Sequence, residues 1–333
     1  MDVHAHCVPP ALLERLRAED GRHGITVEER DGRALVHVAG GTSIGPVKPA
    51  LLDTTHRLAA MEAARVDVQV LSGWMDLAAT ALPAAVATRY ARMFNESLAE
   101  AAQAAPDRFQ TLATLPLQSP QDAVTELRHA VGSLGMAGAE IGTTVAGRDL
   151  DEPGLEPFWS AVEELGCVLL LHPCASLAGR GVSRHFLGNL VGNPAETTIA
   201  VGHLVFGGVL ERHPGLRLVT VHGGGFAPYQ LGRWDHAFHG DVRGAATHLT
   251  RPPSHWVRQL HHDTVLHSPR SLRLLLDVVG ADHVVLGSDY PFEMGDASPV
   301  ALLDSVPGLS DEQRALVLRD NLARLIPGLA AAS

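Results

Sequence analysis

The sequence predicts a single α/β domain with the architecture of a (β/α)8 barrel. Eight short apolar segments alternate with longer amphipathic segments along the 333 residues, which is the order of elements in such a barrel. Most of the apolar segments are nearly continuous hydrophobic runs, as in parallel strands that are buried on both faces. No internal repeat or low-complexity linker divides the chain, although its length alone would also allow two smaller domains. We therefore expect one domain over residues 1–333.

The strands are expected where short apolar runs cluster, at residues 1–6, 66–72, 109–115, 136–141, 167–172, 216–222, 260–266 and 283–289. The helices are expected where apolar residues recur with helical spacing, at residues 84–105, 120–131, 156–165, 195–211 and 270–279.

Residues 21–41 interrupt this alternation. Two β-rich runs there flank the dipeptide Asp31-Gly32, which favours a two-residue hairpin turn. We expect a small β-hairpin inserted after the first strand, at the mouth of the barrel. It would serve either as part of a lid or as a surface ornament.

Composition excludes several classes of protein. Hydrophobic residues make up 46% of the chain and charged residues 19%, which is typical of a globular domain. The formal charge of −11 argues against nucleic acid or an anionic membrane as a partner. No apolar run approaches the roughly 20 residues of a membrane span, and the first residues lack the basic and apolar regions of a signal peptide. With three cysteines, a disulfide framework is not expected, and we expect a cytoplasmic protein.

Polar residues that carry chemistry stand at the ends of four predicted strands. The first strand contains His4 and His6, which are two residues apart and so face the same side. The fifth strand ends in His172, the sixth in His222 and the eighth in Asp289. Because the active site of such a barrel lies at the carboxyl ends of its strands, these five side chains are expected to converge.

Imidazoles and a carboxylate in this arrangement predict a metal centre. Neutral histidine and aspartate are natural ligands of a divalent cation such as zinc. We expect His4, His6, His172 and Asp289 to hold one cation, with room for a water molecule whose pKa falls toward about 7. His222 is then the candidate for proton transfer, because histidine titrates near neutrality. Asp263, beside the seventh strand, is a candidate to orient one of the imidazoles.

The segments MDVHAH, LLHP, VHGGG and VLGSDYPF resemble the amidohydrolase superfamily. They resemble most the branch that contains 2-amino-3-carboxymuconate-6-semialdehyde decarboxylase and related aromatic-acid decarboxylases. The likeness extends over nearly the whole chain and includes RLAAMEAARVDVQVLS (57–72) and RPPSHWV (251–257). The resemblance implies a (β/α)8 barrel, one divalent metal (Zn²⁺ commonly, Mn²⁺ in some relatives) and a homodimer. It also places the metal ligands at His4, His6, His172 and Asp289, and the histidine that activates the metal-bound water at His222.

The fourth strand carries an unusual residue for this resemblance. Other amidohydrolases hold two metals with a carbamylated lysine on that strand, but Lys48 is the only lysine here and lies elsewhere. Glu140, in GAEIG, ends the strand instead, where relatives often have a neutral residue. It would either bridge a second metal, contact the substrate or orient a ligand, and we favour the last two roles.

Arg233 follows His222 by eleven residues. By resemblance, an arginine at this position reaches the active site of a neighbouring subunit and binds a substrate carboxylate, a task that suits a planar guanidinium. The alternative is a local ion pair with Asp235.

The substrate pocket departs from the resemblance in two places. A further arginine is expected near Gly45, where the nearest cation is Lys48, and the tryptophans expected after the fifth strand are replaced by residues such as His185. We therefore expect a remodelled pocket. Trp74 is a candidate to stack on a flat substrate and Phe292 to line the site.

These expectations combine into a function: a metal-dependent, non-oxidative decarboxylase of an aromatic or unsaturated carboxylic acid. In one route His222 draws a proton from metal-bound water. In another the substrate chelates the metal, and Asp289 or His222 protonates the ring carbon. The alternatives are a metal-dependent hydrolase or hydratase that cleaves or hydrates a C–N, C–O or C–C bond, and a catalytically silent binding protein.

Overall fold

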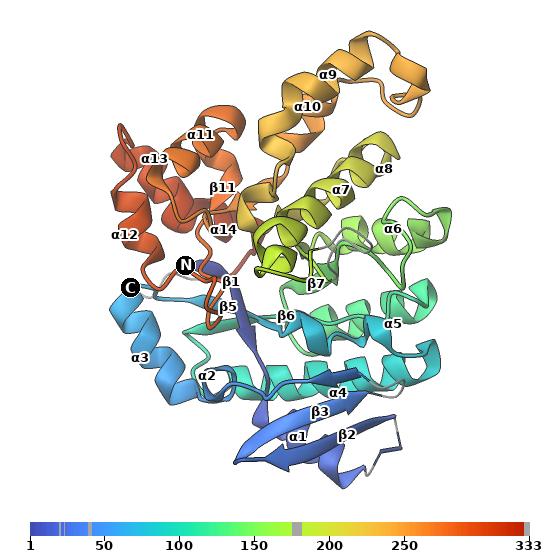
Figure 1. Ribbon diagram of the computed structural model, residues 1–333, viewed down its shortest axis with the longest axis vertical. Coiled ribbons are helices and arrows are strands. Elements are labelled where there is room, and N and C mark those ends of the chain that lie inside the picture. Colours follow the sequence, from blue (N-terminus) through green and yellow to red (C-terminus); the bar gives the residue numbers. More distant parts are fainter. Residues whose placement is uncertain (20, 23, 39–41, 175–181, 330–333) are drawn as a thin grey trace.

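The computed structural model describes residues 1–329 except residues 20, 23, 39–41 and 175–181. Within them, eight parallel strands form one sheet in the order β1-β5-β6-β7-β8-β9-β10-β11, surrounded by helices (Figure 1). The strands of this sheet are β1 (Asp2–Cys7), β5 (Gln69–Gly73), β6 (Phe109–Ala113), β7 (Gly138–Gly142), β8 (Val168–His172), β9 (Arg217–Thr220), β10 (His261–Asp263) and β11 (Val284–Val285). Each overlaps one predicted strand, so the expected barrel is confirmed.

The last predicted strand differs most from expectation, because regular pairing stops after Val285. Residues 286–290 instead close the barrel against β1 through single backbone hydrogen bonds. The amide of Val3 donates to Leu286 O at 2.9 Å, and the amide of Asp289 donates to His4 O at 2.8 Å. Asp289 has a φ of 57°, which ends the extended conformation and leaves its side chain beside β1.

The helices in the described residues are α1 (Pro10–Ala18), α2 (Pro49–Leu52), α3 (Thr54–Ala64), α4 (Ala84–Ala102), α5 (Pro120–Gly132), α6 (Glu156–Leu165), α7 (Asn193–Phe206), α8 (Val209–Arg212), α9 (Leu231–His239), α10 (Pro253–Val257), α11 (Pro269–Val279), α12 (Pro299–Asp304), α13 (Asp311–Ala315) and α14 (Asn321–Leu325). The single helix expected over residues 195–211 is two helices, α7 and α8. The break falls at Gly207 and Gly208, and Gly208 has a φ of 72°, a left-handed conformation that favours glycine at a helix end. None of the described helices is long and apolar enough to cross a membrane.

The inserted hairpin is present and carries a third strand. The strands β2 (Ile25–Arg30), β3 (Arg33–Val38) and β4 (Thr42–Ile44) form a separate antiparallel sheet. Asp31 and Gly32 have φ values of 53° and 72°, as in the two-residue turn that the sequence predicts. Residues 23 and 39–41 of the predicted insertion lie outside the described residues. The third strand was missed because three residues are too few to show an alternating pattern.

This small sheet lies at the same end of the barrel as the predicted site. Ile25, Val36 and Ile44 face a narrow cavity whose other wall includes Leu77 and Leu82. Residues 77 and 82 belong to the connection that follows the carboxyl end of β5. The expected position at the barrel mouth agrees with this packing, while the role as a lid stays a prediction.

Candidate metal centre and active site

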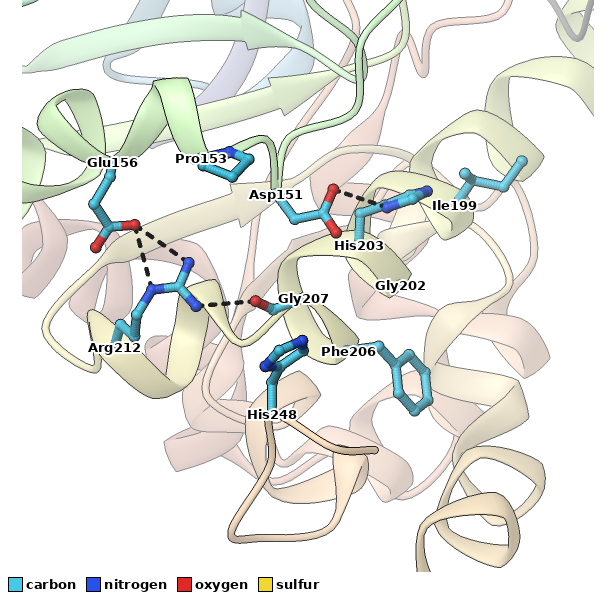
Figure 2. Close-up of a pocket in the computed structure, with 10 residues that line it drawn as sticks. All are labelled: Asp151, Pro153, Glu156, Ile199, Gly202, His203, Phe206, Gly207, Arg212 and His248. Atoms are coloured by element: carbon cyan, nitrogen blue, oxygen red, sulfur yellow. Dashed lines mark hydrogen bonds and ion pairs between the residues drawn. The ribbon is translucent and has the colours of Figure 1, made fainter. Parts of the chain in front are cut away.

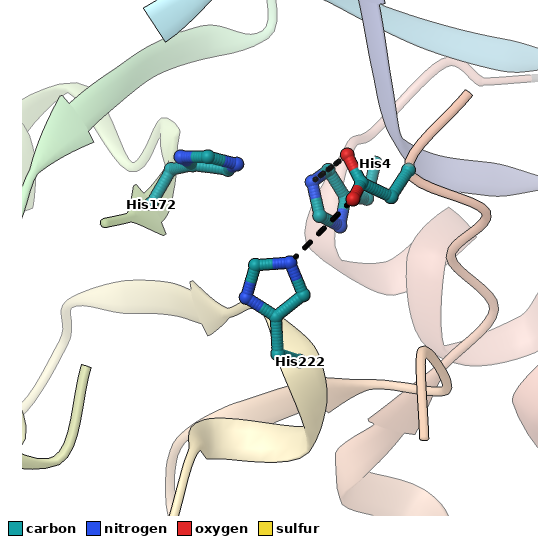
Figure 3. A group of neighbouring side chains, drawn as sticks. His4, His172 and His222 are labelled. Atoms are coloured by element: carbon teal, nitrogen blue, oxygen red, sulfur yellow. Dashed lines mark ion pairs between the residues drawn. The ribbon is translucent and has the colours of Figure 1, made fainter. Parts of the chain in front are cut away.

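Alternation along the strands explains why distant histidines meet. In β8, Val168 and Leu170 belong to the cluster inside the barrel, whereas Leu169 and Leu171 pack between the sheet and the helices. Because alternate residues of a strand face the same side, His172 continues the inward series at the strand's carboxyl end. Figure 3 shows the result for three histidines, whose rings point toward one region between the strand ends.

The five residues predicted from the strand ends do converge. His4 Nε2 lies 3.1 Å from His6 Nε2, and Asp289 Oδ1 lies 3.4 Å from the first and 3.2 Å from the second. One ligand atom from each of His4, His172, His222 and Asp289 lies within 4.8 Å of the others. His222 Nε2 is 3.7 Å from Asp289 Oδ2.

In three of these histidines, the hydrogen bond of Nδ1 determines whether Nε2, which faces the centre, carries a proton. His4 Nδ1 is 2.7 Å from Asp263 Oδ2, His6 Nδ1 is 3.0 Å from Gly73 O, and His172 Nδ1 is 2.8 Å from Pro173 O. All three partners are acceptors, so each Nδ1 carries the proton and donates it. In the neutral imidazoles, each Nε2 therefore presents a lone pair to the centre. Lone pairs that face one another and a carboxylate fit a bound cation.

Electrostatics of the centre point the same way. Burial lowers the pKa of His172 well below its usual range, which keeps that ligand neutral. Burial by itself raises the pKa of Asp289, but the neighbouring imidazoles outweigh it and hold the pKa well below the usual range. At His6, burial lowers the pKa, but the hydrogen bond to Asp289 and the charge of Glu140 more than offset it and raise the pKa to about 9. The centre thus favours a positive charge, which a metal ion supplies when it displaces the proton.

Asp263 orients the His4 ring by accepting a hydrogen bond from its Nδ1. Besides His4 Nδ1, this carboxylate accepts the amide of Gly223 at 2.8 Å and the amide of Val265 at 3.1 Å. Burial acts to raise the pKa of Asp263, but the hydrogen bond and charge of His4 outweigh it and lower the pKa. One ionised side chain thereby links β1, β10 and the turn that holds His222.

The HGGG turn after β9 is sterically determined. His222 has a φ of 54° and the glycines that follow also have positive φ. A Cβ atom on Gly224 would lie 2.4 Å from His262 Nδ1, and one on Gly225 would lie 2.2 Å from Pro194 O. The turn therefore needs glycine both for its conformation and for close packing. It leaves His222 partly accessible, with 16% of its side chain exposed.

A cavity of about 310 Å³ opens above the centre. Its lining residues are His6, Lys48, Trp74, Met75, Asp76, His172, Pro173, Cys174, Phe186, Asn189, Asn193, His222, Asp289, Phe292, Glu293 and Met294. The rings of Trp74 and Phe292 lie 6.0 Å apart and form an aromatic wall, as their positions in the sequence suggested.

Loop residues that sequence reasoning did not place contribute the charges of this cavity. Lys48 Nζ lies 2.5 Å from Glu293 Oε2 and 5.5 Å from the centre of the Phe292 ring. Asp76 lies on the connection after β5, and burial raises its pKa. The sequence indicated Lys48 only as the cation nearest to Gly45, where the resemblance leads us to expect an arginine. Asp76 and Glu293 had none, because their positions depend on loop conformation.

Three predicted substrate-binding residues do not line this cavity of their own chain. Arg233 is exposed on α9, in the part of the molecule that extends away from the barrel (Figure 1). Asp235, its alternative partner, instead accepts the amide of Ser254 at 2.9 Å. His185 is exposed, while its neighbour Phe186 lines the cavity. Glu140 is buried behind His6, with Oε1 3.7 Å from His6 Nδ1.

A larger cavity of about 770 Å³ lies elsewhere, between α6, α7 and α8 (Figure 2). Its charged side chains pair with each other. His203 Nδ1 lies 3.0 Å from Asp151 Oδ1, and the guanidinium of Arg212 donates to Glu156 at 3.3 and 3.2 Å. Because these four charged side chains of the larger cavity already pair with each other, the smaller cavity over the histidines is the better candidate for chemistry.

Known proteins resemble this chain over most of its length. It is 29% identical over 325 residues to 2-amino-3-carboxymuconate-6-semialdehyde decarboxylase of Dictyostelium discoideum, covering 96% of this chain and 89% of the relative. It is 33% identical over 251 residues to gamma-resorcylate decarboxylase of Rhodococcus jostii (71% and 75%). The structure of 5-carboxyvanillate decarboxylase from Sphingomonas paucimobilis superimposes with a TM-score of 0.83 at 25% identity, over 98% of each chain. A family model described as amidohydrolase matches residues 1–328, and the chain therefore belongs to the amidohydrolase family.

Proposed function

We propose that this protein is a metal-dependent, non-oxidative decarboxylase of a small aromatic or unsaturated carboxylic acid. One observation carries the proposal. Three imidazole Nε2 lone pairs and the Asp289 carboxylate face one point at the floor of a cavity that has an aromatic wall. The similar proteins named above are decarboxylases of such acids, which supports the same reaction class here.

The cavity suits a flat, anionic substrate. Trp74 and Phe292 provide apolar surface for a ring or a conjugated chain. Lys48 stands over the same cavity with its ammonium paired to Glu293, and we propose that it exchanges this partner for the substrate carboxylate.

In the reaction, the carbon–carboxylate bond breaks, carbon dioxide leaves, and the electron pair that remains on carbon takes up a proton. No oxidant is needed. The cation, when bound, supplies a Lewis acid that polarises substrate oxygens or acidifies a bound water. His222 is placed to move the proton, because its Nε2 faces Asp289 and its Nδ1 has no hydrogen-bond partner among the described residues. Asp289 holds the imidazole and serves as a metal ligand.

We further propose zinc as the native metal, with manganese as the alternative, since the four expected ligands offer three imidazoles and one carboxylate. The proposed assembly is a homodimer in which Arg233 of one subunit completes the other subunit's cavity. Arg233 is exposed on α9, which is compatible with that role. A cytoplasmic location suits the three free cysteines.

The reaction is tested with metal-loaded protein and a panel of hydroxybenzoic and conjugated unsaturated acids. Headspace carbon dioxide and the product mass are measured together. We expect carbon dioxide in stoichiometric yield, and a loss of about 10²- to 10⁴-fold in kcat for His222→Asn. His239→Asn, an exposed histidine on α9, is the matched control. Incorporation of water without release of carbon dioxide would instead establish a hydratase or hydrolase.

The shared site is tested by mixing two variants. Arg233→Ala and His222→Asn are each expected to be inactive alone. In a 1:1 mixture of exchanging dimers, about a quarter of the sites combine an intact His222 with an intact Arg233 from the partner. Recovery of that share of activity supports the proposal. A fully active monomer in sedimentation would refute it.

A further inference from the structure

A second cavity lies beside the metal centre at the mouth of the barrel. Its volume is about 470 Å³, compared with about 310 Å³ for the cavity above the centre. All of its lining residues belong to segments that follow the carboxyl ends of β8, β9, β10 and β11. These are the ends at which a barrel of this kind binds its substrate. The second cavity is therefore placed where part of a substrate can enter it.

The two cavities share a wall. Asn189, Asn193, His222 and Met294 line both of them. Asn189 and Asn193 lie four residues apart at the entry to α7, a spacing that places both side chains on one face of a helix. His222 is the proposed proton-transfer residue. A molecule that contacts His222 above the metal centre is therefore also next to the second cavity.

The second cavity differs from the first in charge. Charged side chains such as Lys48 and Glu293 line the cavity above the centre. No lysine, arginine, aspartate or glutamate is among the described residues that line the second cavity. Its walls are mostly apolar and include Val265, Leu266 and Leu274. Because an ionised group is costly to bury without a partner, this cavity favours a neutral and largely apolar group.

Tyr229 provides a polar group at this apolar surface. It lines the second cavity, and its hydroxyl is buried without a hydrogen-bond partner among the described residues. Burial raises the pKa of Tyr229 to about 12, so the hydroxyl keeps its proton at neutral pH and is able to donate it. A buried hydroxyl without a partner is unfavourable. A bound group that carries an oxygen atom would supply the missing acceptor.

The rim of the second cavity is apolar and exposed. Leu190, Phe226 and Leu274 have 48%, 42% and 50% of their surface exposed, whereas Val265 has 4% exposed. A protein partner would cover such a rim, and so would a bound substrate. The partnerless hydroxyl of Tyr229 and the wall shared with His222 favour the substrate, because both features belong to the interior of the cavity and not to its rim.

We propose that the second cavity is a substrate subsite, which binds a neutral ring that carries a hydroxyl or carbonyl oxygen. The ring is part of the acid whose carboxylate end lies above the metal centre, and its oxygen pairs with the Tyr229 hydroxyl. The inference rests on the proposed function and narrows its substrate class to acids that have two such parts. It leaves the bond that breaks and the route of the proton unchanged.

The test uses two parent acids, 2-hydroxybenzoic acid and 2,4-pentadienoic acid, with their phenyl and hydroxyphenyl derivatives at each open carbon. Metal-loaded, full-length protein is assayed for release of carbon dioxide, and kcat/KM of each derivative is divided by that of its parent. We expect at least one derivative to exceed its parent by at least about tenfold, because the added ring moves from water to an apolar surface. The hydroxyphenyl form should exceed the phenyl form at the same carbon.

Substitutions in the protein show where the added ring binds. Leu274→Trp fills the second cavity from its rim, and Arg270→Trp is the matched control, because Arg270 is exposed on the same helix, α11, and lines neither cavity. Leu274→Trp should lower the ratio of derivative to parent by at least about tenfold, whereas Arg270→Trp should leave that ratio unchanged. Tyr229→Phe should remove the advantage of the hydroxyphenyl form over the phenyl form.

The inference is overturned if no derivative exceeds its parent, or if Leu274→Trp and Arg270→Trp change the ratio equally. A crystal structure of the metal-loaded wild type with the best derivative decides if Leu274→Trp does not fold. A partner subunit's side chain in the second cavity, in place of the added ring, would contradict the subsite. Turnover of the parent acids without any preference for the derivatives would leave the proposed function intact, whereas no carbon dioxide from any acid would refute that function itself.

Discussion

Replacing Asp263 with asparagine should weaken metal binding, although Asp263 is not itself a ligand. The side chain is fully buried. Its Oδ1 accepts the amides of Gly223 and Val265, and its Oδ2 accepts the proton of His4 Nδ1. Asparagine has one acceptor oxygen, which the two amides would retain. Its NH₂ group would then face His4 Nδ1, so two donors would meet.

Moving the proton of His4 to Nε2 relieves this clash but removes the lone pair that faces the centre. The lost hydrogen bond to a charged group corresponds to about 1.5–3 kcal/mol, which is roughly a 10- to 150-fold weaker metal affinity. Mutation of groups that orient metal ligands typically lowers metal affinity by a similar factor, about 10- to 100-fold.

Chelator competition with Asp263→Asn measures this loss, and denaturant unfolding of the metal-free protein measures the accompanying loss of stability. Asp304→Asn is the control, because Asp304 pairs with Arg65 and Arg314 on the surface, where a pair contributes about 0–1 kcal/mol. A variant at Asp263 that holds the ion as tightly as the wild type would show that the hydrogen bond does not set the His4 tautomer.

Three further predictions follow from the same geometry. Gly224→Ala places a Cβ atom 2.4 Å from His262 Nδ1 at a φ of +76°, so urea unfolding should show that the free energy of unfolding falls by about 2 kcal/mol or more. The control is Gly232→Ala, which has no atom within 4 Å of the new Cβ and should change the free energy of unfolding by less than about 1 kcal/mol. Equal effects of the two substitutions would contradict the steric reasoning. Metal affinity should begin to fall as the pH drops below about 9, because the ion must displace the proton of His6, whose pKa is raised to about 9. Full retention of metal after dialysis at pH 4 would argue against histidine ligands. Lys48→Ala should raise KM for the acid substrate with a smaller effect on kcat, and Lys48→Arg should restore most of the loss; an unchanged KM would remove Lys48 from the substrate pocket.

Much of the barrel follows from local patterns. Continuous apolar runs placed each of the eight strands, and Asp31-Gly32 located the hairpin turn. Errors arose where tertiary contacts override the pattern. The last strand was predicted too long, because residues 286–290 pair with β1 only through isolated hydrogen bonds, and such pairing depends on a segment from the other end of the chain.

The substrate pocket was less predictable than the metal centre. Trp74 and Phe292 line the cavity as expected, since both follow a strand directly. Lys48, Asp76 and Glu293 enter it from loops, whose course no periodic pattern encodes. The sequence could name Lys48 as the nearest cation but could not place its ammonium beside Glu293 and Phe292.

The sequence by itself determined which side chains meet at the centre. Strand alternation and the common direction of parallel strands carry His4, His6, His172 and Asp289 to one end of the barrel, whatever the details of packing. Only the tertiary structure decided which ring nitrogens of the histidines carry protons and which carboxylates lie next to the rings. The hydrogen bond from His4 to Asp263 joins residues 259 positions apart, and Glu140 of β7 lies with its Oε1 3.7 Å from His6 Nδ1 of β1. Hydrogen bonds between distant segments depend on distances of a few tenths of an ångström, which no local pattern of residues specifies.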